Sequence, residues 1–98
     1  MRTIQAEHEA WVRERFPQAT AEDCLLKLVE EVGELVKAHN REAWHDGELE
    51  PTRDAVGDVV VSLMGYCSLR GWDIEVETEG VWLDVKRRKF GPLSKTTI

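Results

Sequence analysis

The sequence lacks the features that would place it in a membrane or an oxidising compartment. No stretch approaches the roughly 18 apolar residues of a membrane span, and the N-terminal MRTIQAEHEA lacks the apolar run of a signal peptide. Cysteine is scarce: Cys24 and Cys67 lie far apart among apolar residues and do not form a CxxC pair. Both thiols are therefore expected to be buried and free. We expect a cytoplasmic protein with no membrane partner.

Positive charge is also in short supply. Thirteen Lys and Arg residues against nineteen Asp and Glu residues give a formal net charge of -6. Such a chain is not expected to bind a nucleic acid polymer through electrostatic attraction to its phosphates. However, a divalent cation held by carboxylates turns an acidic cluster into a phosphate-binding site. The composition excludes a nonspecific nucleic-acid binder and leaves a nucleotide enzyme open.

Strand-like alternation is absent over any useful length, and the apolar spacing is helical throughout. With 98 residues the chain has the length of one domain, so we expect a single all-α domain over 1–98. The pattern predicts four helices, at about 3–16, 20–43, 52–69 and 73–90. Residues 91–98 carry no core signal and are expected to form a frayed tail.

Local signals set the expected helix ends. Thr20 with Asp23 resembles a capping box, while Thr52 and Asp73 are expected to cap the third and fourth helices. Gly80 is expected to interrupt the fourth helix. The expected architecture is therefore four helices joined by short polar connections.

Acidic residues border the apolar faces of the two central helices. At about 100° per residue, Glu31 lies at the edge of the apolar arc of the second helix, and Glu34 lies about 60° beyond that arc. Asp54 and Asp58, four residues apart, share a flank of the third helix. The two apolar arcs contain Cys24, Leu25, Leu28, Val29, Val32, Leu35 and Val36, and Val56, Val59, Val60, Leu63 and Cys67. If the helices pack antiparallel through these arcs, the acidic flanks converge.

Four convergent carboxylates repel one another unless cations lie between them. Mg²⁺ and Mn²⁺ prefer carboxylate and water oxygens, and bound Mg²⁺ keeps positions that substrate phosphates complete. Metal binding is the economical interpretation of this pattern. The alternative is a solvated charged face on an acidic helical adaptor that has no metal site.

The segments EEVGEL and DAVGDVVVSL resemble the MazG-type nucleotide pyrophosphohydrolases, an all-α family marked by EExxE and a later ExxD. This resemblance implies Mg²⁺-dependent hydrolysis of a ribo- or deoxyribonucleoside triphosphate to the monophosphate and pyrophosphate. It also implies a four-helix bundle-like domain that dimerises into a larger helical bundle, as a homodimer or homotetramer. By position, Glu30, Glu31 and Glu34 match EExxE, and Asp58 matches the last acid of ExxD.

The resemblance and the chemistry together suggest a role for each acid. Glu31, Glu34 and Asp58 are expected to bind the metal, and Glu30 to be an outer ligand or the base that orients the attacking water. The first acid of ExxD falls on Ala55, which has no ligating atom; Asp54 is the nearest substitute.

Other residues are candidates for binding the nucleotide. Lys27 can bind phosphate or pair with a neighbouring acid, and the cluster Lys86, Arg87 and Arg88 can bind phosphate or be a solvated helix end. Trp44 can stack on the base or serve as a packing anchor. Trp11, Trp72 and Trp82 are expected in the core or at an interface.

The sequence thus predicts a Mg²⁺-dependent nucleoside triphosphate pyrophosphohydrolase. The alternative function is a noncatalytic helical dimer that binds a protein partner or a nucleotide. Ala55 is the feature that keeps this alternative open.

Overall fold

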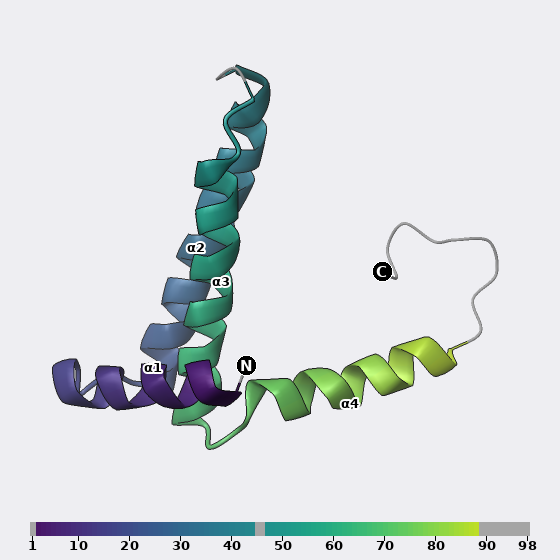
Figure 1. The fold of residues 1–98 in the computed structure, drawn as a ribbon. Coiled ribbons are helices and arrows are strands. Elements are labelled where there is room, and N and C mark those ends of the chain that lie inside the picture. The colour runs from purple at the N-terminus through teal and green to yellow at the C-terminus, as the bar shows by residue number, and fades with distance from the viewer. Residues whose placement is uncertain (1, 45–46, 89–98) are drawn as a thin grey trace.

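The computed structural model describes residues 2–44 and 47–88, and every regular element within these ranges is helical (Figure 1). The α-helices are α1 (Arg2–Arg15), α2 (Ala21–Arg41), α3 (Glu50–Leu69) and α4 (Ile74–Arg87), and a short 3₁₀ helix, η1 (Glu42–Trp44), follows α2. The all-α prediction is therefore confirmed. The expected tail over 91–98 lies outside the described residues. No helix in the described ranges has both the length and the apolar character needed to cross a membrane.

Two of the expected helix caps are present. Thr20 and Asp23 form a reciprocal capping box: the Asp23 amide donates to Thr20 Oγ1 at 3.2 Å, and the Thr20 amide donates to Asp23 Oδ2 at 2.9 Å. Asp73 caps α4 by accepting a hydrogen bond from the Val76 amide at 2.9 Å. These caps fix where α2 and α4 begin.

Two of the boundary predictions were wrong. Thr52 does not cap α3, because the helix already begins at Glu50, with Pro51 in its first turn. The fixed φ of proline suits that position, so the helix starts two residues earlier than the threonine signal suggested. Gly80 does not interrupt α4, which runs through it as a regular helix. A single glycine lowers helix stability but leaves the hydrogen-bond ladder intact.

The centre of the fold is an antiparallel hairpin of α2 and α3 (Figure 1). Its seam consists of residues that are at least partly buried and that recur at alternating spacings of three and four, as in a coiled coil. They are Cys24, Leu28, Glu31, Leu35 and Ala38 in α2, and Thr52, Ala55, Val59, Ser62 and Tyr66 in α3. We call these ten residues the seam.

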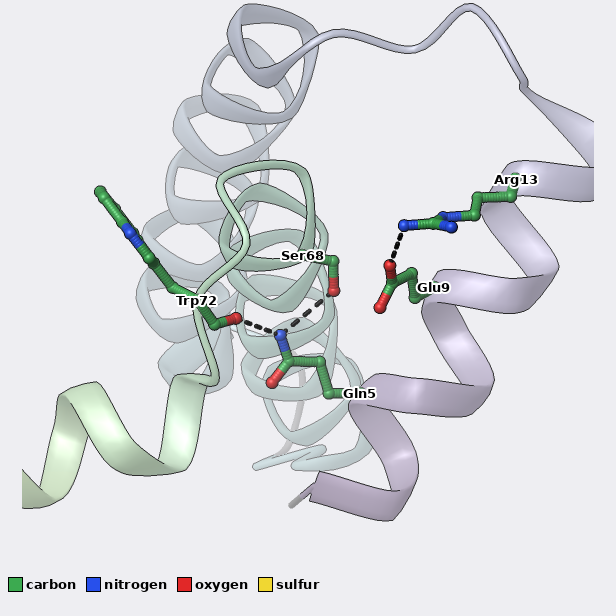
Figure 2. A network of polar contacts seen from close by, with 5 residues as sticks. All are labelled: Gln5, Glu9, Arg13, Ser68 and Trp72. Atoms are coloured by element: carbon green, nitrogen blue, oxygen red, sulfur yellow. Dashed lines mark hydrogen bonds and ion pairs between the residues drawn. The ribbon is translucent and has the colours of Figure 1, made fainter.

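The other two helices, α1 and α4, attach at the end of the hairpin where α3 ends, opposite the connection between α2 and α3 (Figure 1). Met64, Cys67 and Ile74 form the buried core, with Val60 packed against it. Figure 2 shows how Gln5 of α1, only 6% exposed, joins this end: its Nε2 donates to Ser68 Oγ at 3.1 Å and to the Trp72 carbonyl at 2.8 Å. Its Oε1 accepts from the Ile74 amide at 2.9 Å. The amide of Gln5 therefore fixes the direction in which α4 leaves.

Much of the expected core is exposed in the single chain. None of the residues of α2, all of which are described, is fully buried, and Val29 is 71% exposed. Trp11, Trp72 and Trp82 are each more than 40% exposed, so they do not lie in the core of the chain. The radius of gyration is 16.1 Å, whereas a compact chain of this length is expected at about 13 Å. The four helices are observed, but a closed four-helix bundle within one chain is not.

Candidate metal and nucleotide site

The four predicted metal-binding carboxylates line one open cleft between α2 and α3. The cleft has a volume of about 240 Å³, and its acidic residues are Glu31, Glu34, Asp54 and Asp58. The convergence expected from antiparallel packing is therefore observed. We call this cavity the carboxylate cleft.

The register of the hairpin explains the convergence. Glu34 directly precedes the seam residue Leu35, and Asp54 and Asp58 directly precede Ala55 and Val59. In antiparallel helices, positions that precede the seam lie on the same side of the hairpin. Glu31 occupies a seam position itself, between the two helices.

Glu31 is much less exposed than the neighbouring acid Glu30, and both lie close to Lys27. Its side chain is 12% exposed, against 64% for Glu30, and its Oε1 lies 3.0 Å from Lys27 Nζ. Lys27 Nζ also lies 3.8 Å from Glu30 Oε1. The hydrogen bond with Glu31, followed by the charge of Glu30, raises the pKa of Lys27. Lys27 thus makes the ion pair that was the alternative to phosphate binding, and it holds a positive charge beside the cleft.

Two cations of the carboxylate cleft are not among the site residues predicted from the sequence. Lys37 and Arg41 line the cleft together with the acids. The signal was present, because Arg41 lies seven residues after Glu34 and therefore two turns along the same face of α2. A cleft with both carboxylates and cations can hold a metal ion and a phosphate together.

The donor set of the cleft fits a hard cation. Carboxylate oxygens are preferred ligands of Mg²⁺ and Mn²⁺, and the cleft is open enough for water and a substrate to complete the coordination. In the described ranges, however, no three His, Cys, Asp or Glu side chains already lie close enough to hold one ion. Glu34, Asp54 and Asp58 are exposed, so their side chains can change rotamer. The carboxylates are suitable ligands for a metal ion and line the same cleft, but their side chains would have to move toward the ion to bind it.

An apolar groove of about 320 Å³ lies beside the carboxylate cleft. We call it the aromatic groove; its lining includes His8, Trp11, Phe16, Lys27 and Val61. The Trp11 and Phe16 ring centroids lie 5.7 Å apart in an edge-to-face arrangement. Lys27 lines this groove and pairs with Glu31 of the cleft, so the two cavities adjoin. The sequence pattern predicts Trp11 in the core or at an interface and gives no sign of this groove.

The other predicted nucleotide-binding residues lie elsewhere in the chain. Trp44 is 83% exposed in η1 and does not line the carboxylate cleft. Lys86, Arg87 and Arg88 lie at the exposed end of α4, which leads away from the hairpin (Figure 1). Arg88 Nη2 pairs with Asp84 Oδ2 at 2.7 Å. A single chain therefore does not bring these residues to the carboxylate cleft.

Ala55 contributes a wall of the cleft and no ligand. It is 6% exposed and occupies a seam position, whereas Asp54 is exposed and lines the cleft. Asp54 can therefore offer its oxygens to the same cleft from a different direction.

Comparison with protein-family models, with curated proteins and with solved structures finds no match for this chain.

Proposed function

We propose that the protein is a Mg²⁺-dependent nucleoside triphosphate pyrophosphohydrolase, which converts an NTP or dNTP to the monophosphate and pyrophosphate. The observation that carries the proposal is the meeting of four carboxylates, two from each helix, in one cleft beside an aromatic groove. A nucleotide has the complementary parts: a flat base and a polyphosphate that binds metal ions. The proposal includes a homodimer or homotetramer as the working form. It places the reaction in the cytoplasm, in keeping with two free thiols, Cys24 and Cys67.

Each group of residues has a task in this proposal. Glu31, Glu34, Asp58 and Asp54 would hold Mg²⁺, which neutralises charge on the phosphate oxygens when bound. Lys27, Lys37 and Arg41 can bind phosphate oxygens at the edges of the cleft.

Glu30 and the aromatic groove complete the assignment. Glu30 is exposed next to Lys27 and can orient the attacking water or accept its proton. Trp11 and Phe16 can stack on the base, which is worth about 1–3 kcal/mol for a base on an aromatic side chain.

The test is release of pyrophosphate from a panel of ribo- and deoxyribonucleoside triphosphates in millimolar Mg²⁺. Glu31→Gln and Glu34→Gln keep the side-chain shape and remove a ligand charge, so turnover should fall about 100-fold or more. Glu22→Gln, an exposed acid in the first turn of α2, is the control and should keep wild-type turnover. Trp11→Leu should raise KM more than it lowers kcat. Equal effects of the three glutamate changes would show that the motif is only a charged face.

A second candidate is the noncatalytic dimer, and the observation that favours it is the buried Ala55 in the wall of the cleft. In that case the protein would bind a nucleotide or a protein partner but release no pyrophosphate from any member of the panel. Ala55→Glu would then be the change expected to restore activity.

A further inference from the structure

The aromatic groove and the carboxylate cleft lie on the same side of the α2–α3 hairpin. Residues that line the two cavities share one position, directly before a seam residue. They include Asp23, Lys27 and Val61 in the groove, and Glu34, Lys37 and Asp58 in the cleft. In antiparallel helices such positions form a strip along one side of the pair. One extended ligand can therefore contact both cavities.

The chemical character of this strip changes in a fixed order. The aromatic groove lies at the end where α1 crosses the hairpin (Figure 1). Along α2 the acids of the cleft come next, and Lys37 and Arg41 come last, toward the connection with α3. Helix α3 runs the opposite way and gives the same order of groove and acids, because Val61 of the groove follows Asp58 of the cleft in the sequence. The strip is thus apolar at one end, acidic in the middle and cationic at the other end.

The two cations at the end of the strip are available to a ligand. In the ranges that the structure describes, neither Lys37 nor Arg41 makes an ion pair or a side-chain hydrogen bond, whereas Lys27 lies 3.0 Å from Glu31. Both are exposed, and both line the cleft. A long side chain on a helix leans toward the helix N-terminus, so that of Arg41 extends back toward the acids. Charged donors of this kind bind phosphate oxygens.

The opposite end of the strip does not suit a phosphate. Most side chains that line the aromatic groove are apolar, and its one acid, Asp23, would repel a phosphate. The hydrogen bond that this carboxyl accepts from the Thr20 amide lowers its pKa, so Asp23 is charged at neutral pH. The cation of the groove, Lys27, is already paired with Glu31. A ligand with one apolar end and one phosphate end therefore fits the strip in only one direction.

We propose that the nucleotide lies along the hairpin with its base in the aromatic groove and its terminal phosphate on Lys37 and Arg41, which set the preference for a triphosphate over a diphosphate. The inference rests on the proposed function and adds to it the direction of binding and the residues that recognise the third phosphate. A diphosphate bound in this direction ends at the acids and does not reach the two cations. Lys37 and Arg41 are specificity-determining residues, because the bond between the α and β phosphates lies nearer the acids.

The first measurement compares KM and kcat for the triphosphate that the protein hydrolyses fastest with those for its diphosphate, in millimolar Mg²⁺. Arg41→Gln removes a charge from the terminal phosphate and should raise KM for the triphosphate about tenfold, with KM for the diphosphate and both kcat values close to wild type. Lys37→Gln should act in the same direction. Arg41→Lys keeps the charge and should recover most of the loss. Far-UV circular dichroism checks that each variant remains helical.

Arg53→Gln is the matched control. Arg53 is exposed and directly follows the seam residue Thr52, so it lies on the other side of the hairpin. Its substitution removes the same charge and should leave KM for both nucleotides unchanged. Trp11→Leu, at the base end of the strip, should raise KM for the triphosphate and the diphosphate by the same factor, because both carry the base.

The second measurement separates binding from hydrolysis. The α,β-methylene analogues of ATP and UTP, and of the matching diphosphates, cannot be cleaved between the α and β phosphates, and isothermal titration in MgCl₂ gives their Kd values. Wild type should bind at least one triphosphate analogue about tenfold more tightly than its diphosphate, and Arg41→Gln should abolish this preference. Equal weakening of both analogues in Arg41→Gln would overturn the inference and leave the proposed function standing. The expected preference without any release of pyrophosphate would remove the activity and support the binding direction. Binding of none of the analogues would overturn both.

Discussion

At the residue scale, the charge of the cleft depends on which of two neighbouring residues carries a carboxylate. Ala55 is buried in the seam, and Asp54, one residue earlier, reaches the cleft from the exposed side. We predict that Asp54→Asn weakens Mg²⁺ binding nearly as much as Asp58→Asn, because both remove a charge from the same cavity. Isothermal titration with Mn²⁺ measures both affinities. If Asp54→Asn leaves the affinity unchanged, Asp54 acts only as a favourable acid near the start of α3.

Ala55→Glu is the reciprocal change in this experiment. It adds a carboxylate beside the seam residue Glu31 and should tighten Mn²⁺ binding, while Ala55→Gln has the same size and no charge. Tighter Mn²⁺ binding in both variants would point to altered packing of the seam rather than to a new ligand.

His8 illustrates a different consequence of burial at the residue scale. Its Nδ1 is buried and has no hydrogen-bond partner among the described residues, and desolvation lowers its pKa below 6.5. As pH falls through 6.5, the unfolded chain takes up a proton before the folded chain does, so stability decreases toward acid. We predict that the melting temperature of wild type drops between pH 7.5 and 5.5, and that His8→Gln makes this drop smaller. An unchanged drop in His8→Gln would show that this imidazole is not the source of the pH dependence.

At the scale of the elements, the Gln5 network decides how α4 is attached. Gln5→Ala removes hydrogen bonds to Ser68 and Trp72 and leaves the buried Ile74 amide without its acceptor. We predict a loss of about 2–3 kcal/mol in the free energy of unfolding, measured by urea denaturation. Glu9→Ala is the matched control on α1, because it removes an exposed ion pair with Arg13 and should cost less than about 1 kcal/mol. Comparable losses in the two variants would mean that the network does not hold α4.

The helices themselves were predictable because local signals determine them. The capping box of α2, the Asp73 cap of α4 and the apolar spacing predicted these two helices to within a few residues, and the wheel positions of Glu31 and Asp58 predicted the shared cleft. Sequence spacing shows which side of a helix is apolar but not what covers it. The spacing therefore predicts that Val29 and Trp11 are covered, whereas Val29 is 71% exposed and Trp11 lines the aromatic groove. The direction of α4 depends on Gln5, whose partners lie more than 60 residues away in sequence and leave no local signal.

At the scale of the whole molecule, the hairpin separates two kinds of surface. The side with the carboxylate cleft and the aromatic groove is suited to a charged ligand with an apolar part, and the opposite side is suited to another apolar face. A substitution on one side of the hairpin can therefore be tested without disturbing the other side.

This separation allows the metal to be tested through the stability of the whole molecule. A cleft whose carboxylates repel one another should be stabilised by the ion it binds, by about 2.7 kcal/mol at a hundred times Kd. For a domain of this size that corresponds to a rise in melting temperature on the order of 10 °C. We predict this rise in millimolar MgCl₂ or MnCl₂ but not in NaCl of equal ionic strength.

Protein concentration must be constant, because dissociation of a dimer also shifts the melting temperature. The variant with both Glu34→Gln and Asp58→Asn should lose most of the Mg²⁺ effect, while Val36→Lys, a change at an exposed position on the opposite side of the hairpin, should keep it. If the chloride salts of Mg²⁺ and Na⁺ act alike on wild type, the cleft does not bind the metal, and the acidic adaptor becomes the better account of the protein.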